Sequence, residues 1–305
     1  MKSKFVYRKY ICIWEYNLKK ITCNLCGNKD YVFMYRIDTK KSHFDVVRCS
    51  KCRLVYVNPQ PSSKEIENMY DKDYFHGHGF DEGIDYALSL KNREVWYPVF
   101  NSRLDNIERY VRKSNILDIG CGFGEFMMMA KKRGWKAKGI ELSKYASGVA
   151  KKLDLDVFNG SIEKAKFKEK FSVLTMFEVV EHLPDPLKTL KECGRFIKDD
   201  GIFVIQTGDA DSMYARFKGK KWPYLLAGHL HYFSRSTLTS MLKKAGFDVI
   251  HIYNGDEISL GARFEFIHLL KKKGLMTNAE YVKQIFMQAI RKIGVGGMTV
   301  YAKKS

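Results

Sequence analysis

From residue 113 onward, short apolar segments alternate with longer segments of helical character. The short segments predict six strands, at residues 115–120, 136–142, 155–160, 171–179, 201–207 and 247–254. The longer segments predict helices at residues 124–133, 144–153, 186–196 and 236–245. Strands and helices in alternation are typical of an α/β protein with a parallel, doubly wound sheet. Ligands of such sheets bind beyond the carboxyl ends of the strands.

The part of the chain before residue 113 has a different pattern. Residues 31–37 and 44–49 have strand-like composition, and residues 64–113 read as mostly helical. Two prolines end the last of the early strands, and Ser62 or Ser63 can cap a helix that begins near Lys64. We therefore expect three parts: an N-terminal extension with a small strand-rich unit (1–60), a helical linker or cap (61–113), and the α/β domain (114–305).

Four of the seven cysteines have the spacing of a metal site, and they are Cys23, Cys26, Cys49 and Cys52. They form two C-x2-C pairs, and two tight turns that each carry a pair of thiolates suit a tetrahedral Zn²⁺. The strand-like segments between the pairs are what a zinc ribbon requires. The pairing disfavours two disulfides, as does a cytoplasmic location. We predict a structural zinc site that takes no part in the chemistry.

Composition adds little about function. The chain has 305 residues, of which 45% are hydrophobic and 14% aromatic, so it can bury a full core. Its first twenty residues lack the apolar stretch of a signal peptide, and no run of about 18 apolar residues follows, so we expect a cytoplasmic protein. The formal charge of +19 could attract nucleic acid, anionic lipid or a phosphorylated substrate. Because the lysines are dispersed, we favour an ordinary solvated surface, with an anionic acceptor as second choice.

Three glycines at every second position follow the strand at 115–120, and they are Gly120, Gly122 and Gly124. A nucleoside triphosphate is excluded, because a P-loop needs Lys and then Ser or Thr where Glu125 and Phe126 stand. The dinucleotide fingerprint has two residues in its second gap, whereas this chain has one. Asp118 precedes the glycines and would repel a pyrophosphate, yet it suits a ligand that carries an ammonium and a sulfonium. This electrostatic argument favours S-adenosylmethionine.

The segment LDIGCGFGEF resembles the first motif of the class I S-adenosylmethionine-dependent methyltransferases. The resemblance implies a Rossmann-like, doubly wound, seven-stranded methyltransferase sheet with the small zinc ribbon in front of it. It also implies that Asp118 helps to organise the loop and the cofactor's amino group, and that Glu141 accepts both ribose hydroxyls. Ser161 stands where many relatives have Asp for adenine. The implied cofactor-binding residues are Asp118, Gly120, Cys121, Gly122, Glu141, Leu142, Ser161 and Glu178.

The resemblance covers most of residues 20–255 and points to the branch that includes ubiquinone-type O-methyltransferases. The segments FEVVEHLPDP and GHLHYFSRSTLTSMLKKAGF are typical of that branch, and the ribbon resembles a subset linked to sugar modification. Residues 296–305 resemble the family's final antiparallel strand, which would insert between strands five and six. Residues 256–293 would then be a helical insertion over the acceptor side.

Three histidines are candidate general bases, because a pKa near the working pH suits proton transfer. We expect His182 or His231 in this role, with His229 as the further candidate; any one of them could instead be structural. Glu178, Glu181 and His182 form E-x-x-E-H, which resembles the divalent-metal triad of some related O-methyltransferases. Those three could hold Mg²⁺ or Mn²⁺; alternatively, Glu178 contacts the cofactor.

The sequence therefore predicts a methyltransferase that acts on a small molecule, most plausibly at an oxygen of a saccharide or nucleotide-linked sugar. Lys220 and Lys221, beside Trp222, would suit an anionic acceptor such as a sugar phosphate. One alternative is an RNA or protein methyltransferase that uses the ribbon for recognition, although the fourth strand lacks the [DN]-P-P-[YF] signature. Another is a non-catalytic module that only binds the cofactor.

Overall fold

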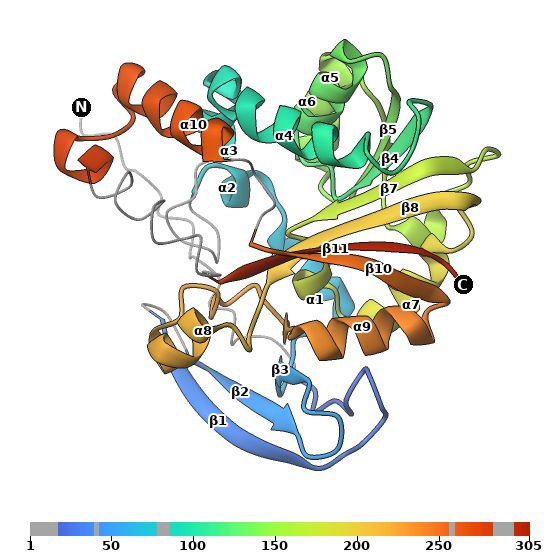
Figure 1. Cartoon of the computed structure of the whole chain (residues 1–305). Helices are drawn as coiled ribbons and strands as arrows, with labels where there is room; N and C mark the ends of the chain where they lie inside the picture. The colour runs from blue at the N-terminus through green and yellow to red at the C-terminus, as the bar shows by residue number, and fades with distance from the viewer. Residues whose placement is uncertain (1–17, 40–42, 78–85, 256–259, 283–295) are drawn as a thin grey trace, which may run out of the picture.

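The computed structural model describes residues 18–39, 43–77, 86–255, 260–282 and 296–305, which form two sheets and the helices around them (Figure 1). The larger sheet has seven strands in the order β10-β11-β8-β7-β4-β5-β6. Their bounds are β4 (Asn115–Ile119), β5 (Lys136–Glu141), β6 (Asp156–Asn159), β7 (Phe171–Phe177), β8 (Ile197–Gly208), β10 (Phe247–Asn254) and β11 (Gly297–Lys304). The predicted Rossmann-like methyltransferase sheet is confirmed.

The final strand lies where the resemblance placed it. β11 pairs antiparallel with both β8 and β10, whereas β4, β5, β6, β7 and β8 pair in parallel. β8 begins at Ile197, four residues before the expected start at residue 201. Its register against β7 shifts after the pair formed by Phe171 and Ile197, so the strand contains an irregularity near its start.

The predicted helices of the α/β domain are present: α5 (Glu125–Lys132), α6 (Lys144–Lys152), α7 (Pro186–Cys193) and α9 (Arg235–Lys244). Side chains fix where three of them begin, because Ser143, Asp185 and Ser234 each accept a hydrogen bond from the first turn of α6, α7 and α9. In Figure 1, α5 and α6 lie on one face of the sheet, and α7 and α9 lie on the other.

The described residues between the ribbon and the α/β domain, 61–77 and 86–113, are largely helical. It contains α1 (Ser63–Met69), α2 (Lys72–Phe75), α3 (Tyr86–Lys91), η2 (Arg93–Trp96) and α4 (Tyr97–Ile107). A capping box between Ser62 and Glu65 begins α1. In the predicted insertion, α10 (Leu260–Lys272) packs on η2 and α4, where the rings of Trp96 and Phe266 lie 4.7 Å apart. Residues 256–259 and 283–293 of that insertion lie outside the described residues.

The smaller sheet contains the ribbon strands and one short strand from the α/β domain. Its order is β1 (Tyr31–Asp38), β2 (His43–Cys49), β3 (Val55–Val57) and β9 (His231–Tyr232), all antiparallel. Ribbon residues such as Leu54 and Tyr56 belong to the same buried cluster as Leu174 of β7 and Leu242 of α9. The ribbon is therefore packed into the core beside the large sheet.

Candidate active site

The glycine loop leaves one place where a ligand can reach the backbone. Gly120, Gly122 and Gly124 all have positive φ, at 73°, 55° and 84°. A Cβ atom on Gly120 would collide with Val179, and one on Gly124 with Leu155, whereas one on Gly122 would meet no described atom within 4 Å. The outer glycines thus permit close internal packing, and Gly122 faces open space.

Glu141 is held against this loop at the end of β5. Its side chain is buried; Oε2 accepts a hydrogen bond from the Gly122 amide (2.8 Å) and Oε1 one from the Ser143 amide (2.7 Å). Burial raises the pKa of Glu141, and these two backbone hydrogen bonds oppose that rise. Since each carboxylate oxygen has a second lone pair, the group can still accept two hydroxyls, as a ribose presents them.

Asp118 is buried on β4, where its Oδ1 accepts the Thr175 hydroxyl at 2.7 Å. Burial raises the pKa of Asp118 to about 7, although the Thr175 hydrogen bond and the charge of Arg103 act in the opposite sense. The neighbouring Cys121 is also buried, which raises the pKa of its thiol and keeps it neutral. Asp118 can therefore change its charge near neutral pH.

The remaining predicted cofactor positions lie at the ends of β5 and β6. The Leu142 carbonyl accepts a hydrogen bond from Asn159 Nδ2 at 3.0 Å, which ties the two strand ends together. Ser161 is partly exposed just after β6, and its hydroxyl hydrogen-bonds Glu163. Strand ends at the same edge of the parallel sheet thus gather all these residues.

Arg103 of α4 is a functional candidate that the sequence did not reveal. Its guanidinium lies 4.1 Å from the ring centroid of Phe177, and its Nη2 donates to Gln206 Oε1. Its positive charge lowers the pKa of both Asp118 and Glu178 against the larger effect of burial. The helical cap therefore places a cation between the cofactor side and the acceptor side of the site.

Glu178 stands at the carboxyl end of β7 in a conformation unusual for its residue type. Its backbone φ is 54°, a value that residues other than Gly, Asn and Asp rarely adopt. Its Oε1 accepts hydrogen bonds from Gln206 Nε2 (2.9 Å) and the Tyr224 hydroxyl (3.3 Å). Glu181 is buried beside it, and burial together with the charge of Glu178 raises the pKa of Glu181 well above its ordinary value. The two side chains therefore form a buried carboxyl pair that disfavours two full negative charges.

Glu181, His182 and His229 form a group that could hold a metal ion, with ligand atoms within 4.8 Å of one another. His182 Nδ1 lies 2.9 Å from the Gly228 carbonyl, and His229 Nδ1 lies 2.8 Å from the Tyr224 carbonyl. These contacts make both Nδ1 atoms donors and leave each Nε2 with a lone pair. Burial lowers the pKa of His182 to about 4 and that of His229 well below its usual value, so both imidazoles are neutral at pH 7.

The structure groups the predicted catalytic residues differently from the sequence. His182 lies beside His229, with ring centroids 4.6 Å apart, and the metal-competent group contains His229 where the E-x-x-E-H pattern had suggested Glu178. His231 lies on β9 with no exposed surface, and its Nε2 is 3.1 Å from Asn24 Oδ1 in the ribbon. The geometry does not bring His231 together with the other two histidines.

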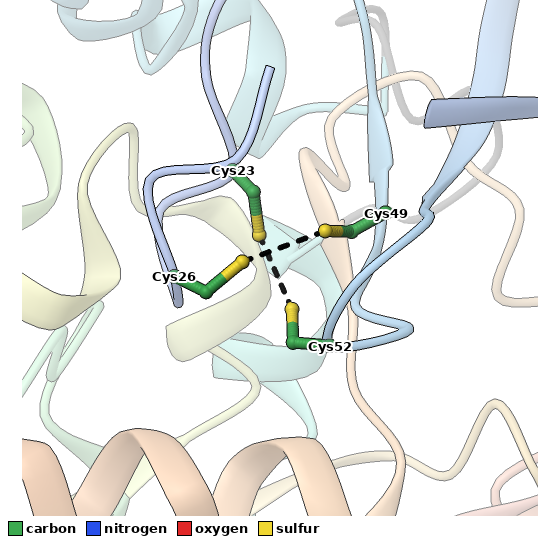
Figure 2. A group of neighbouring side chains, drawn as sticks. All are labelled: Cys23, Cys26, Cys49 and Cys52. Carbon is green, nitrogen blue, oxygen red and sulfur yellow. Dashed lines mark hydrogen bonds between the residues drawn. The ribbon is translucent and has the colours of Figure 1, made fainter. Parts of the chain in front are cut away.

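The four ribbon cysteines point at a common centre (Figure 2). Their sulfurs lie within 4.8 Å of one another, with 3.4 Å between Cys23 and Cys52 and 3.5 Å between Cys26 and Cys49. Zn–S bonds of about 2.3 Å in a tetrahedron place sulfurs about 3.8 Å apart, so the donor set fits Zn²⁺. Burial disfavours the thiolate of Cys49, yet hydrogen bonds from the backbone of Cys52 and Lys51 lower its pKa to about 6.

The first cysteine turn also supports the acceptor side of the site. Asn24 Nδ2 donates to the Pro184 carbonyl at 3.3 Å, while Asn24 Oδ1 faces His231. The Leu230 amide, one residue after His229, donates to the Glu181 carbonyl at 2.8 Å. Ribbon, β9 and the segment around Glu181 are therefore linked by consecutive hydrogen bonds.

Comparison with known proteins agrees with this fold and this site. A family model described as a methyltransferase domain matches residues 94–252, more than half of the chain. The chain therefore belongs to the methyltransferase-domain family, within the class I S-adenosylmethionine-dependent fold. No helix among the described residues has the length and apolar character to cross a membrane.

The similar curated proteins include ubiquinone biosynthesis O-methyltransferases. That of Actinobacillus pleuropneumoniae serotype 7 is 32% identical over 120 residues, which are 34% of this chain and 51% of that protein. That of Nitrosospira multiformis is 27% identical over 197 residues, 59% of this chain and 80% of that protein. The chain thus spans about half the length of the first of these relatives.

Among solved structures, a complex between the Haloferax volcanii Trm112 methyltransferase activator and a candidate methyltransferase is similar. The TM-score is 0.51 at 16% identity, and the match covers 72% of this chain and 96% of that chain. At this identity the likeness shows the fold.

Proposed function

We propose that the protein transfers a methyl group from S-adenosylmethionine to an oxygen of a small molecule, most plausibly a saccharide or nucleotide-linked sugar. The observation that carries the cofactor assignment is the arrangement at the ends of β4 and β5. Gly122 faces open space there, Glu141 accepts a hydrogen bond from its amide, and Asp118 is a second buried carboxyl on β4. Two carboxylates beside an open glycine backbone suit a cationic nucleoside and not a pyrophosphate.

Each cofactor group has a matching residue. Glu141 would accept the two ribose hydroxyls, Asp118 would pair with the ammonium, and Arg103 would pair with the carboxylate. The bound cofactor would supply an electrophilic methyl group. The protein's contribution would be to hold the acceptor oxygen in line with it, which can be worth an effective concentration of about 10⁵ M or more.

Proton removal from the acceptor would fall to the histidine pair. His182 and His229 are neutral, and each has its Nε2 available because Nδ1 is held by a carbonyl. We propose one of these two as the general base in place of His231, which the ribbon encloses.

The alternative role of the same residues is to bind a divalent metal ion. Glu181, His182 and His229 would hold Mg²⁺ or Mn²⁺, with the Glu178 carboxyl beside them. When bound, such an ion would lower the pKa of an acceptor hydroxyl. Titration with Mn²⁺, followed by electron paramagnetic resonance, separates the readings: stoichiometric binding lost in Glu181→Gln supports a metal, and absence of binding supports the histidine base.

The acceptor assignment draws on the resemblance of the ribbon to sugar-modifying relatives and on the two exposed lysines near the site. Trp222 itself is buried and stacks on Tyr224 at 5.2 Å, so its face is not free for a sugar ring. An RNA or protein methyltransferase with the ribbon as a recognition module is less favoured, because the fourth strand lacks the [DN]-P-P-[YF] signature. We also propose that the protein is cytoplasmic.

Calorimetry with S-adenosylmethionine and a mass-shift screen of nucleotide sugars with labelled cofactor test this function together. We expect binding and transfer in the wild type, and we expect either His182→Ala or His229→Ala to keep binding but lose transfer. Cofactor binding without transfer to any acceptor would favour the non-catalytic module, and no binding would refute the assignment.

A further inference from the structure

The segment that follows β8 exposes two large apolar side chains. It contains α8 (Met213–Lys218) and η5 (Gly219–Lys221), and it lies at the edge of the molecule in Figure 1. Phe217 is 84% exposed and Met213 is 73% exposed. Because the two are four residues apart on a helix, they share one outward face. Among the described residues these are the most exposed large apolar side chains.

Basic side chains surround that apolar pair. Arg216, Lys218, Lys220 and Lys221 are all exposed and occur within six consecutive residues. Arg216 lies 3.7 Å from Asp211, an exposed pair of little strength, and Lys218 lies over the rings of Tyr214 and Phe217. The local charge is therefore strongly positive, on a chain whose formal charge is +19.

The inner face of the same segment is fixed to the smaller sheet. Ala215 and Trp222 are buried in a cluster with Phe44, Val46 and Tyr232. Ser212 caps the first turn of α8 through the Ala215 amide at 3.1 Å. The exposed residues are thus presented by an anchored element with few conformations to lose on binding.

We propose that the outward face of α8 and η5 docks on an anionic lipid bilayer. Phe217 and Met213 would enter the boundary between headgroups and acyl chains, and the four cations would lie at the lipid phosphates. RNA would satisfy the cations but leave the apolar pair in water. A bilayer satisfies both kinds of side chain at once.

The docked segment leads along the chain into the acceptor side of the site. Three residues after η5, Tyr224 donates its hydroxyl to Glu178 and its carbonyl contacts His229 Nδ1. This orientation rests on the proposed function, whereas docking itself does not. A membrane-bound chain would hold the acceptor side near the lipid surface.

Sedimentation of the full chain with vesicles tests the proposal. We expect binding to phosphatidylglycerol–phosphatidylcholine vesicles, little binding to phosphatidylcholine alone, and a decline with salt. Each cation near an anionic surface contributes about fivefold, so Lys220→Glu with Lys221→Glu should weaken binding more than about tenfold. Phe217→Ser should weaken it several-fold. The matched control, Lys151→Glu with Lys152→Glu at the exposed end of α6, changes net charge equally and should bind like the wild type.

Three results would overturn docking: no binding to anionic vesicles at low salt, equal loss in the α6 control, or no effect of Phe217→Ser. Tight binding of a single-stranded RNA oligonucleotide that anionic vesicles do not displace, lost in the Lys220 and Lys221 variant, would assign the face to nucleic acid instead. Affinity for S-adenosylmethionine should be unchanged in every variant, which keeps a failure of docking distinct from a failure of the methyltransferase assignment.

Discussion

The cofactor half and the acceptor half of the site are built in different ways. The cofactor half comes from two consecutive strand ends, where the amides of Gly122 and Ser143 both donate to the Glu141 carboxylate. The acceptor half is assembled from segments far apart in the chain, with Arg103 on α4, Glu178 after β7 and His229 after η5. Local hydrogen bonds between neighbouring strand ends fix the cofactor half, whereas packing between distant segments of the chain fixes the acceptor half.

The two halves also differ in what supports them. The ribbon contacts the acceptor half through Asn24, His231 and the Leu230 amide, whereas the glycine loop bonds to β5. A substitution that disrupts the ribbon should therefore change the positions of the histidines more than it changes cofactor binding. A substitution at the end of β5 should change cofactor binding more than it changes the histidines.

Removal of the zinc ion that we propose at the four ribbon cysteines should give the largest effect. Chelation, or Cys49→Ser, should lower the melting temperature by more than about 10 °C, because structural zinc contributes many kcal/mol and the ribbon shares the main core. Well below the new melting temperature, affinity for S-adenosylmethionine should fall only a few-fold. Metal content by mass spectrometry, calorimetry and scanning fluorimetry measure this. A parallel collapse of cofactor binding would show that the halves are not separable.

The substitution Glu141→Ala tests the cofactor half. It removes two charge-assisted hydrogen bonds to ribose and the acceptor of the Gly122 amide, so the dissociation constant should rise about 100-fold, near 2.7 kcal/mol. His229→Ala is the matched control from the acceptor half and should change the constant less than about threefold. Calorimetry gives both values. Similar losses in the two variants would remove the distinction between the halves.

The same difference explains what the sequence could predict. The strands, Asp118 with its glycines, Glu141 and the four cysteines all lie in contiguous patterns whose spacing carries the chemistry. β9 has two residues and pairs with β3, some 175 positions earlier in the chain, as its Tyr232–Val55 pair shows, so no local pattern could indicate it. Arg103 and Tyr224 gain their roles only when α4 and the loop after η5 close over the end of β7.

The pH dependence of S-adenosylmethionine affinity should also distinguish the two halves of the site. The pKa of Asp118 is raised to about 7, so this group is neutral below that pH and a carboxylate above it. Since the ligand's ammonium prefers the carboxylate, affinity should rise as pH increases through about 7, by up to about tenfold per unit. It should decline again near pH 8, where an α-amino group loses its proton.

Asp118→Asn should remove the acidic limb of this profile. The limb should persist in Glu125→Gln, which removes the other buried carboxyl whose pKa burial raises to about 7. His182 should contribute nothing between pH 6 and 8, because its pKa is lowered to about 4. A limb unchanged in Asp118→Asn would assign the titration to another group.

Ser161 should give the smallest effect, because it lies at the margin of the cofactor half. Its hydroxyl already hydrogen-bonds Glu163, which also accepts the Thr189 hydroxyl at 3.1 Å, so little of its bonding capacity is directed at a ligand. Ser161→Ala should weaken S-adenosylmethionine binding about twofold, the value of a weak neutral hydrogen bond. Ser161→Asp should strengthen it a few-fold if this strand end faces adenine, because a carboxylate accepts a stronger bond from an amino group. Calorimetry with S-adenosylhomocysteine measures both, and a tenfold loss in Ser161→Ala would move this residue to the centre of the cofactor half.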